Sequence, residues 1–445
     1  MPQDDSAARH RAAAAGAVGN VVEWYDFAVF GASATLLADV LTAGGEGGLT
    51  SVFAVFALSF VVRPLGALVI GARADRAGRR GPLVTTLGLM TVATAAIGLL
   101  PPWAAIGTAA TVALLVLRAV QGFSSGGELV VSVTYLVEHA PRQRRGLRGG
   151  LHLATMALGF AAGMGAVAVL QRELGPTAMA DWGWRLPFLL AVPLGLVCFY
   201  LRWRTDETPD FRAQVTVARS RLAPLAEVVG RHRATVAGGF LLAAALASSF
   251  NLWFVYLPSR LVSDGRYELP AVLGGALAGL LVMAVSAVVC GRLSDRWGRR
   301  PLLLAGVVAV TALWVVAPAR VADGSLGTLV VADVAMGAAL GAFVLQSALA
   351  DRLPARVRTS GMAVTFGFAT ALVGGTAPLV ATLLSDGVYV QLYGLVWVLS
   401  ASVVAARWSG SADASESGST DVSESDGRAG GPASASREAV SLAEG

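Results

Sequence analysis

Two ten-residue stretches, G-A-R-A-D-R-A-G-R-R at 71–80 and G-R-L-S-D-R-W-G-R-R at 291–300, decide how this chain folds. Both place Gly, Asp-Arg and Gly-Arg-Arg in the same register, and they stand roughly half the chain apart. Each stretch is short, polar and enclosed by long apolar blocks. A motif that recurs at this distance indicates a chain built from two related halves.

The composition predicts a membrane protein. The chain has 445 residues, of which 55% are hydrophobic and only 14% charged, whereas soluble domains carry about 25% charged residues. Its apolar residues come in blocks of about twenty, the length that crosses a bilayer core. We therefore predict an all-α membrane protein with twelve transmembrane helices in two six-helix bundles. The blocks lie at 16–40, 51–72, 82–102, 104–138, 148–171, 184–204, 234–259, 269–291, 301–319, 325–350, 358–385 and 388–407.

The arginines predict the orientation. With a cytoplasmic N-terminus, 27 of the 34 arginines fall in inner loops and tails and 5 in outer loops, which satisfies the positive-inside rule in one orientation only. Topology therefore explains the basic charge better than nucleic-acid binding does. We expect a multi-pass protein of the cell membrane with both termini cytoplasmic. The expected domains are a cytoplasmic tail (1–15), an N-terminal bundle (16–204), a cytoplasmic central loop (205–233), a C-terminal bundle (234–408) and a disordered cytoplasmic tail (409–445).

The repeated loops also predict a conformational latch. A glycine can adopt the positive φ of a tight turn, and an Asp at a helix end can pair with Arg or accept from a neighbouring helix N-terminus. Charge pairs of this kind would stabilise one access state, and two copies favour that role over topology alone. The predicted latch residues are Gly71, Asp75, Arg76, Gly78, Arg79, Arg80, Gly291, Asp295, Arg296, Gly298, Arg299 and Arg300, with Glu138 and Arg142 beside them.

Together with these loops, further motifs resemble one transporter family. They are G-N-V-V-E-W-Y-D-F-A-V-F-G (19–31), F-V-V-R-P-L-G (60–66), L-R-A-V-Q-G-F-S-S-G-G-E (117–128), Y-L-V-E-H-A-P-R-Q-R-R-G (135–146), W-G-W-R-L-P-F-L-L (182–190), D-E-T-P-D-F (206–211), L-P-A-R-V-R-T-S-G (353–361) and G-G-T-A-P (374–378). The combination resembles the metabolite:proton symporter family of the major facilitator superfamily. The resemblance implies a major facilitator fold and proton-coupled uptake of a small metabolite.

Two stretches depart from the family pattern. The fourth segment has Leu129, Val130 and Val131 after Gly-Gly-Glu, where the family has Tyr-Gly-Gly. The chain has D-R-L-P at 351–354, where the family often has Glu-Leu-Phe-Pro. The first change puts bulky apolar residues on a helix expected to face the cavity. The family therefore does not predict which substrate this chain carries.

Ionisable residues at membrane depth are candidates for function, because they are costly there. Glu23 and Asp26 share one helical face, and Arg118, Gln121, Ser125 and Glu128 fall on one stripe. Burial and a neighbouring guanidinium together set the protonation of a carboxylate. The predicted proton-coupling residues are Asp26, Glu23 and Glu128. The predicted substrate-binding residues are Arg118, Arg63, Gln121, Ser125, Asn251, Trp253, Tyr256 and Gln346.

Each of these residues has a structural alternative, namely ion pairing or packing that holds the bundle together. For Asp26 and Arg118 the transport role is favoured, and for Arg63 and Glu128 the two roles are balanced. His152 is interpreted as a packed interface residue. Asp333 is expected to be hydrated near the outer mouth, in preference to touching substrate.

The function predicted from the sequence is proton-coupled uptake of a small polar solute, a carboxylate or zwitterion, by alternating access. Alternatives are an exporter of the same fold and, less favoured, a polytopic sensor or membrane enzyme. The sequence lacks a Walker loop, paired metal ligands and a defensible catalytic cluster. We therefore expect no enzyme activity, no metal, no ATP and no cofactor besides the proton. The expected partners are the small-molecule substrate and the lipid bilayer, with the chain a monomer.

Overall fold

A computed structural model describes residues 3–45, 47–77, 80–138, 144–203, 228, 230–354, 361–384 and 386–407. Within these ranges the side chains of 3–16, 71–72, 74–77, 80, 82–83, 127–138, 201–203, 319 and 322–323 are not described. Most of the expected central loop and the whole expected tail at 409–445 therefore lie outside the described residues.

Throughout the described ranges the chain forms helices and connecting turns, with no strand. The first half contains α1 (Gln3–Ala32), α2 (Ala34–Leu41), α3 (Gly48–Val61), α4 (Arg63–Ala77), α5 (Arg80–Gly98), α6 (Trp103–Ile106), α7 (Thr108–Glu138), α8 (Arg145–Ala178), the π-helix η2 (Met179–Gly183) and α9 (Arg185–Trp203). The second half contains α12 (Arg233–Asn251), the π-helix η3 (Leu252–Tyr256), α13 (Leu257–Ser263), α14 (Leu269–Trp297), α15 (Arg299–Asp323), α16 (Leu326–Gly341), α17 (Leu345–Arg352), the π-helices η5 (Ala363–Gly367) and η6 (Thr370–Gly374), α19 (Ala377–Leu384) and α20 (Gly387–Arg407).

Each apolar block of the sequence corresponds to a helix or a run of consecutive helices. In the described residues, nine helical stretches are long and apolar enough to cross a membrane, and α1 with α2 forms a tenth that is bent by 64°. Two shorter apolar helices, Val84–Gly98 and Arg185–Tyr200, occupy the third and sixth predicted segments. Helices dominate because a segment in lipid must satisfy its backbone hydrogen bonds internally.

Two local features of the sequence interrupt the helices. α3 ends at Val61 and α4 begins at Arg63, directly before Pro64. A proline ring lacks an N–H and clashes with the preceding turn. Gly298, expected to permit a tight turn, joins α14 to α15 with φ +86°, a conformation that costs other residues more than glycine. Gly78, its counterpart, lies outside the described residues.

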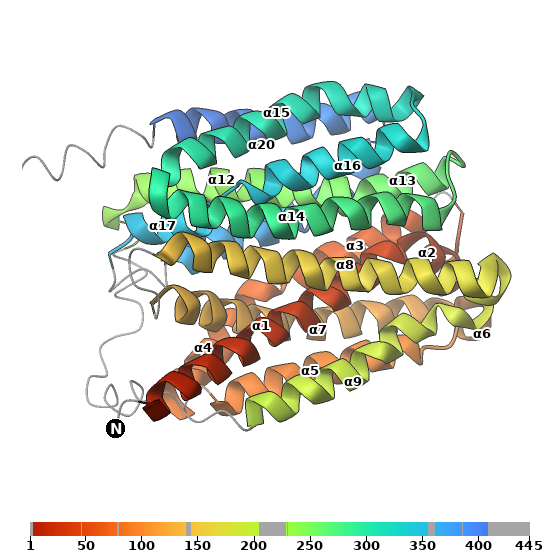
Figure 1. Cartoon of the computed structure of the whole chain (residues 1–445). Helices are drawn as coiled ribbons and strands as arrows, with labels where there is room; N and C mark the ends of the chain where they lie inside the picture. Colours follow the sequence, from red (N-terminus) through yellow and green to blue (C-terminus); the bar gives the residue numbers. More distant parts are fainter. Residues whose placement is uncertain are drawn as a thin grey trace, which may run out of the picture. The chain divides into compact units, whose positions relative to one another are not determined.

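The helices of the two halves run side by side, and α8 lies along α14 over much of its length (Figure 1). Within the first half, α1 packs against α8, α4 against α7 and α5 against α9. Within the second half, α14 packs against α16. A second contact between the halves joins α3 to η6 and α19. The arrangement places α1, α3, α4, α5 and α7 around one interior.

Close glycine contacts bring α3 and α4 against α7. An added Cβ at Gly122 would overlap the backbone carbonyl of Ser59, and one at Gly126 would overlap that of Arg63. An added Cβ at Gly66 would overlap the carbonyl of Phe123. These helices therefore approach backbone to backbone, as small residues allow in membranes. The approach holds Ser59 and Arg63 directly against the helix that carries Arg118.

Gly122→Ala is expected to reduce thermal stability, since the added methyl group has no room without a shift of the helix. Overpacking of this kind typically costs about 1–3 kcal/mol. The measurement is the temperature at which purified protein loses its monodisperse peak in size-exclusion chromatography. Gly88→Ala is the matched control, because nothing lies within 4 Å of an added Cβ there. Equal stability of the two variants would contradict the close packing.

Candidate functional site

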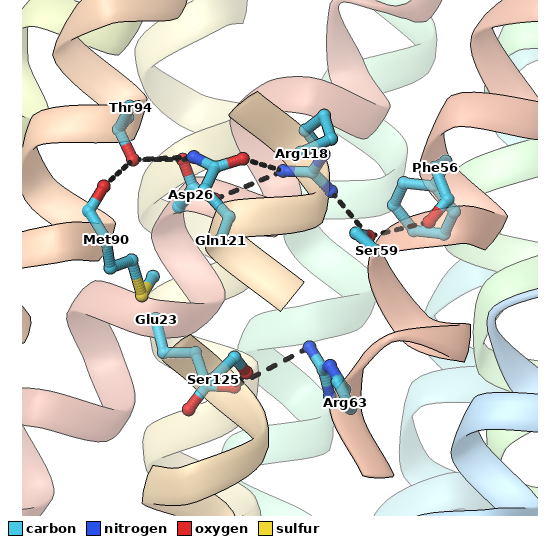
Figure 2. A network of polar contacts seen from close by, with 10 residues as sticks. All are labelled: Glu23, Asp26, Phe56, Ser59, Arg63, Met90, Thr94, Arg118, Gln121 and Ser125. Carbon is cyan, nitrogen blue, oxygen red and sulfur yellow. Dashed lines mark hydrogen bonds and ion pairs between the residues drawn. The ribbon is translucent and has the colours of Figure 1, made fainter. Parts of the chain in front are cut away.

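The most extensive buried polar network described here centres on two carboxylates of α1, three residues apart (Figure 2). Asp26 is 1% exposed and Glu23 is 3% exposed. Each lies near an arginine from another helix, Arg118 of α7 and Arg63 of α4. The helical spacing predicted from the sequence thus places both acids on one face, and the packing supplies each with its own cation.

Asp26 is surrounded by hydrogen-bond donors. Its Oδ2 accepts from Nη1 of Arg118 at 3.2 Å, and its Oδ1 accepts from Nε2 of Gln121 and Oγ1 of Thr94, both at 2.8 Å. Nε2 of Gln121 also donates to Oγ1 of Thr94 at 2.7 Å, and Oε1 of Gln121 accepts from Arg118 at 2.9 Å. A buried carboxylate is tolerated when it is paired and its remaining lone pairs are satisfied. These residues supply that compensation.

Arg118 is fully buried and held by both polar and aromatic neighbours. Its Nη2 donates to Oγ of Ser59 at 3.2 Å. Its guanidinium carbon lies 4.2 Å from the ring centroid of Phe30 and 4.8 Å from that of Phe27. A desolvated cation over an aromatic face gains about 2 kcal/mol. Arg118 is therefore fixed in place by neighbours from α1 and α3.

Arg63 is held differently from Arg118. It lies between the rings of Phe27 at 4.3 Å and Phe60 at 4.1 Å, and its Nη2 is 3.6 Å from Oε1 of Glu23. That distance is too long for a hydrogen bond. Nε and Nη2 of Arg63 are buried and have no hydrogen-bond partner in the described structure. Glu23 also accepts a hydrogen bond from Oγ of Ser125.

The two ion pairs therefore differ in hydrogen bonding, although both are buried. Leaving a buried charged donor without an acceptor costs about 1–3 kcal/mol or more. The pair of Asp26 and Arg118 avoids most of that cost, whereas Arg63 retains donors that a further acceptor could satisfy. A carboxylate is the acceptor whose geometry best matches a guanidinium.

The predicted residues of the second half lie in less polar surroundings. Asn251 donates to the carbonyl of Ala247 within its own helix, and Tyr256 donates to the carbonyl of Ala381 at 3.5 Å. Trp253 donates from Nε1 to Oδ1 of Asp333 at 2.8 Å and packs against Trp314. Gln346 is 7% exposed in α17. None of these forms a hydrogen bond with the described side chains of the network around Asp26.

The expectation for Asp333 is wrong. The sequence suggested a hydrated residue near the outer mouth, but Asp333 is only 2% exposed and is enclosed by η3 and α14. Its neighbours there include Trp253 and two glycines of α14. Distance along a helix from its end does not reveal how closely neighbouring helices cover that turn.

The second repeated loop connects the two halves. Oδ1 and Oδ2 of Asp295 accept from the backbone N–H groups of Gly146 and Leu147 at 2.8 and 2.9 Å. These N–H groups belong to the first turn of α8, so an Asp of one half caps a helix of the other. Nη1 of Arg299 donates to Oδ1 of Asp295 at 2.7 Å. Caps of this type contribute about 0.5–2 kcal/mol.

Asp351 extends these contacts. Its carboxylate accepts from Nη1 of Arg145 at 3.1 Å and from Nε of Arg299 at 3.0 Å. Asp351 thus links the start of α8 to the start of α15. The helices meet closely here, because an added Cβ at Gly150 would overlap the carbonyl of Ala287 in α14.

Several predicted residues cannot be placed in this way. Gly78, Arg79 and Arg142 lie outside the described residues, and only the backbone is described for Gly71, Asp75, Arg76, Arg80, Glu128 and Glu138. Of the second loop, Gly291 meets Gly146 and Gly150, while Arg296 and Arg300 form no ion pair or hydrogen bond described here. The latch in the first loop and a role for Glu128 stay predictions.

Sequence reasoning missed several residues of these networks, among them Ser59, Thr94, Arg145 and Asp351. Ser59 and Thr94 hold Arg118 and Asp26, and Asp351 bridges Arg145 and Arg299. Ser59 lies four residues before Arg63 in the same apolar block, a spacing that places two residues on one face of a continuous helix, and this is a usable signal. Asp351 stands where the chain departs from the family pattern, and that departure was the other available signal. An isolated Thr in an apolar helix, such as Thr94, carries no comparable signal.

Comparison with known proteins identifies the family. Residues 16–378 match the Major Facilitator Superfamily. The chain belongs to this superfamily. The resemblance to the metabolite:proton symporters of the superfamily is confirmed by its sequence relatives.

Two relatives illustrate the similarity within the superfamily. The ectoine/proline transporter ProP of Corynebacterium glutamicum is 36% identical over 406 residues, covering 87% of this chain and 81% of ProP. The citrate-proton symporter of Klebsiella pneumoniae is 35% identical over 390 residues, covering 83% of this chain and 84% of the symporter. Similarity across most of both chains means that this superfamily member is a membrane transporter rather than an enzyme.

A solved structure shows the same fold. The proton:xylose symporter XylE, bound to 6-bromo-6-deoxy-D-glucose, superimposes with a TM-score of 0.73 and is 15% identical in sequence. The match covers 90% of this chain and 95% of XylE. The predicted fold class, a major facilitator bundle of helices, is therefore confirmed.

Among the described residues, no group of three or more His, Cys, Asp or Glu is arranged to hold a metal ion.

Proposed function

We propose that this chain takes up a small zwitterionic solute together with a proton, by alternating access. The observation that carries the proposal is the state of Arg63, a buried guanidinium whose Nε and Nη2 have no hydrogen-bond acceptor among the described residues. It lies beside a carboxylate network from which protons can be exchanged. The similar ectoine/proline transporter supports this class of solute, and the similar citrate-proton symporter supports coupling to a proton.

The charges around Arg63 favour a zwitterion over a polyanion. The carboxylate of a solute can accept from Nε and Nη2 of Arg63, while Glu23 attracts a cationic group nearby. A compound with several carboxylates would face repulsion from Glu23 and Asp26 instead. Proline, ectoine and betaines combine one carboxylate with one cationic centre in a small volume. We therefore assign the substrate role to Arg63 and Glu23, with Ser125 holding the Glu23 carboxylate.

Asp26 is the proposed proton acceptor. In its ionised form it accepts from Arg118, Gln121 and Thr94. The Thr94 hydroxyl has one proton and two acceptors within reach, Oδ1 of Asp26 and the carbonyl of Met90 at 2.9 Å. Protonation of Asp26 weakens its attraction for Arg118 and lets the hydroxyl of Thr94 turn to Met90. A proton on Asp26 thereby loosens contacts among α1, α5 and α7.

The proposal extends to the arrangement in the cell. It places the chain in the cell membrane as a monomer, driven by the proton gradient without ATP, with both termini cytoplasmic. The proposed parts are the N-terminal tail (1–15), two bundles (16–204 and 234–408), the central loop (205–233) and the C-terminal tail (409–445). The excess of arginine in the expected inner loops supports this orientation.

Transport by purified full-length protein in liposomes tests the function. Radiolabelled proline, glycine betaine, ectoine and citrate are offered with an imposed inward proton gradient. We expect a zwitterion to accumulate and a protonophore to abolish the accumulation. Outward flux against the proton gradient would instead support the exporter. Transport restricted to cations without a carboxylate would overturn the role of Arg63.

The contacts of Asp295 support a latch on the side predicted to be cytoplasmic. Asp295→Ala removes the cap on α8 and one of the two carboxylate partners of Arg299, so we expect the contact between halves to open more often. Loss of the cap removes about 0.5–2 kcal/mol of stabilisation from the closed contact between the halves. This corresponds to a shift of about two- to thirtyfold in the equilibrium between the closed and the open contact. The readout is maleimide labelling of Ser347→Cys, a buried site in α17 against Gly149 of α8, with Cys198 and Cys290 replaced by Ala.

The matched control removes a carboxylate whose ion pair lies within one half. Asp264→Ala breaks the exposed pair of Asp264 with Arg260 in the same half, and labelling of the cysteine at position 347 should not change. Exposed pairs of this kind contribute only about 0–1 kcal/mol. If Asp295→Ala labels no faster than this control, the latch role of Asp295 is wrong.

A further inference from the structure

Asp333 is a buried carboxylate to which the function proposed above assigns no role. It lies in α16, within a stretch long and apolar enough to span a membrane, and is 2% exposed. Its one hydrogen bond in the described structure comes from Nε1 of Trp253. No arginine or histidine among the described residues forms an ion pair with it. Asp26 and Glu23, at similar burial, each have an arginine nearby.

The surroundings of Asp333 leave little room for any larger counter-ion. Its Oδ2 would be 2.6 Å from an added Cβ at Gly275, and its backbone carbonyl lies against Gly279. The Trp253 indole that donates to it packs at 5.8 Å against Trp314, whose Nε1 in turn donates to Ser249. A buried carboxylate without a cation is costly in a membrane. A proton is the counter-ion that fits.

The ionisable residues on the elements packed against Asp333 lie toward the helix ends and form no hydrogen bond or ion pair with it among the described side chains. The side chain of Asp323, at the end of α15, lies outside those described. The ionisable residues with described side chains are Tyr256 of η3, Arg260 and Asp264 of α13, Glu268 before α14, Cys290, Arg292, Asp295 and Arg296 of α14, Arg299, Arg300 and Arg320 of α15, and Arg145, Arg148, His152, Arg172 and Glu173 of α8.

Trp253 connects Asp333 to the contact between the two halves. It belongs to the π-helical segment η3, in which Val255 and Tyr256 follow two and three residues later. An added Cβ at Gly31 of α1 would lie 3.1 Å from Val255, and the ring of Tyr256 lies 6.2 Å from that of Phe53 in α3. π-Helical turns within α-helices often occur at functional sites. One short segment thus contacts Asp333 on one face and the first half on another.

We propose that Asp333 is a second proton-binding site, in the C-terminal half, which acts through Trp253 on the segment Leu252–Tyr256 that contacts the N-terminal half. When the carboxyl is ionised, Nε1 of Trp253 donates to a charged oxygen, and this stronger hydrogen bond holds η3 against α16. When the carboxyl is protonated, the hydrogen bond weakens and η3 is held less firmly. The position of η3 against α1 and α3 then follows the protonation of Asp333. This role is separate from that of Asp26 and requires no substrate.

Infrared difference spectroscopy tests the proton site directly. Purified full-length protein in lipid is measured at acidic and at mildly alkaline pH without any substrate. We expect a carboxylic-acid C=O band in the acidic-minus-alkaline spectrum that Asp333→Asn lacks and that the control Asp264→Asn retains. In Trp253→Phe the band should shift in frequency, because the carboxyl loses its N–H donor. An unchanged spectrum in Asp333→Asn would overturn the proposal.

Disulfide cross-linking tests the link to η3. Gly31→Cys and Val255→Cys are combined in a chain with Cys198 and Cys290 replaced by Ala, and the rate of oxidative cross-linking is measured across pH. We expect Asp333→Asn to change this pH profile, and Gly275→Ala to change it as well, because the methyl group displaces the carboxyl. Gly274→Ala, where nothing lies within 4 Å of an added Cβ, should leave it unchanged. Identical profiles with and without Asp333→Asn would show that Asp333 does not act on η3.

A second variant covers the case in which Asp333→Asn does not fold. Trp253→Phe keeps the carboxyl and the aromatic packing while removing the hydrogen bond. We expect it to change the pH profile of cross-linking in the same direction as Gly275→Ala. A wild-type profile in Trp253→Phe would also overturn the proposal. The outcome does not depend on solute uptake, so it is distinct from failure of the proposed function.

Discussion

Asp26→Asn is expected to abolish proton-driven accumulation of the solute while leaving exchange of labelled for unlabelled solute measurable. The asparagine keeps the shape of the side chain and can still accept from Thr94 or Gln121, but it cannot take up a proton. One proton moving down about 100 mV supplies about 2.3 kcal/mol. At about 1.4 kcal/mol for each factor of ten, this supports roughly fiftyfold accumulation of a zwitterion. The variant should therefore fall to equilibration, about onefold.

The measurement compares accumulation and counterflow in the same liposomes, with an imposed membrane potential and proton gradient. In Asp26→Asn the buried Arg118 loses its ion-pair partner. Removing one partner of a buried pair lowers the free energy of unfolding by about 3–5 kcal/mol, so the variant can fail to fold. Asp26→Asn combined with Arg118→Gln removes both charges and should restore folding, as judged by size-exclusion chromatography. Accumulation that survives in a folded Asp26→Asn variant would show that Asp26 does not couple the proton.

Arg63→Lys is expected to weaken binding of solutes that carry a carboxylate while keeping the positive charge near Glu23. Lysine lacks the planar fork that matches a carboxylate. A hydrogen bond to a charged group contributes about 1.5–3 kcal/mol, so the loss corresponds to an increase of about ten- to more than a hundredfold in Kd. Isothermal titration of the purified protein in detergent measures this directly, with proline or glycine betaine as the ligand.

A comparison of proline with prolinamide isolates the contribution of the solute carboxylate to the binding free energy. Wild-type protein should prefer proline to prolinamide, and Arg63→Lys should lose most of that preference. A double-mutant cycle of this kind attributes the loss to one pair of groups. Arg260→Lys is the control, because Arg260 is 44% exposed and pairs with Asp264 at a helix end. If Arg63→Lys weakens both ligands equally, the carboxylate does not bind at Arg63.

The sequence predicted which residues of one helix share a face. Glu23 with Asp26, and Arg118 with Gln121 and Ser125, follow from the spacing of the α-helix. The structure places all five in two neighbouring buried clusters, Arg118 and Gln121 around Asp26 and Ser125 beside Glu23. The twelve apolar blocks were predicted for a similar reason, because length and hydropathy are local properties of a segment. The doubled loops correctly indicated two related halves.

The pairing between helices was not predictable from spacing. Either arginine could have met either acid, and packing of α7 and α4 against α1 and α3 decided that Arg118 meets Asp26 and Arg63 meets Glu23. That packing depends on glycines such as Gly122 and Gly126, whose neighbours lie far away in the sequence. The role of Thr94 also depends on packing, because it contacts Asp26 only when α5 lies beside α1.

The repeated loops and Asp333 illustrate the difference between features that follow from the sequence and features that depend on helix packing. The membrane fold, the two halves and the faces of single helices follow from the sequence, because they depend on composition and on the local geometry of a helix. Three contacts follow from helix packing instead: Asp295 caps α8 of the other half, Asp351 bridges two arginines, and Asp333 is buried with no cation paired to it among the described residues. Those contacts join residues far apart in the chain, so the close approach of packed helices alone determines them.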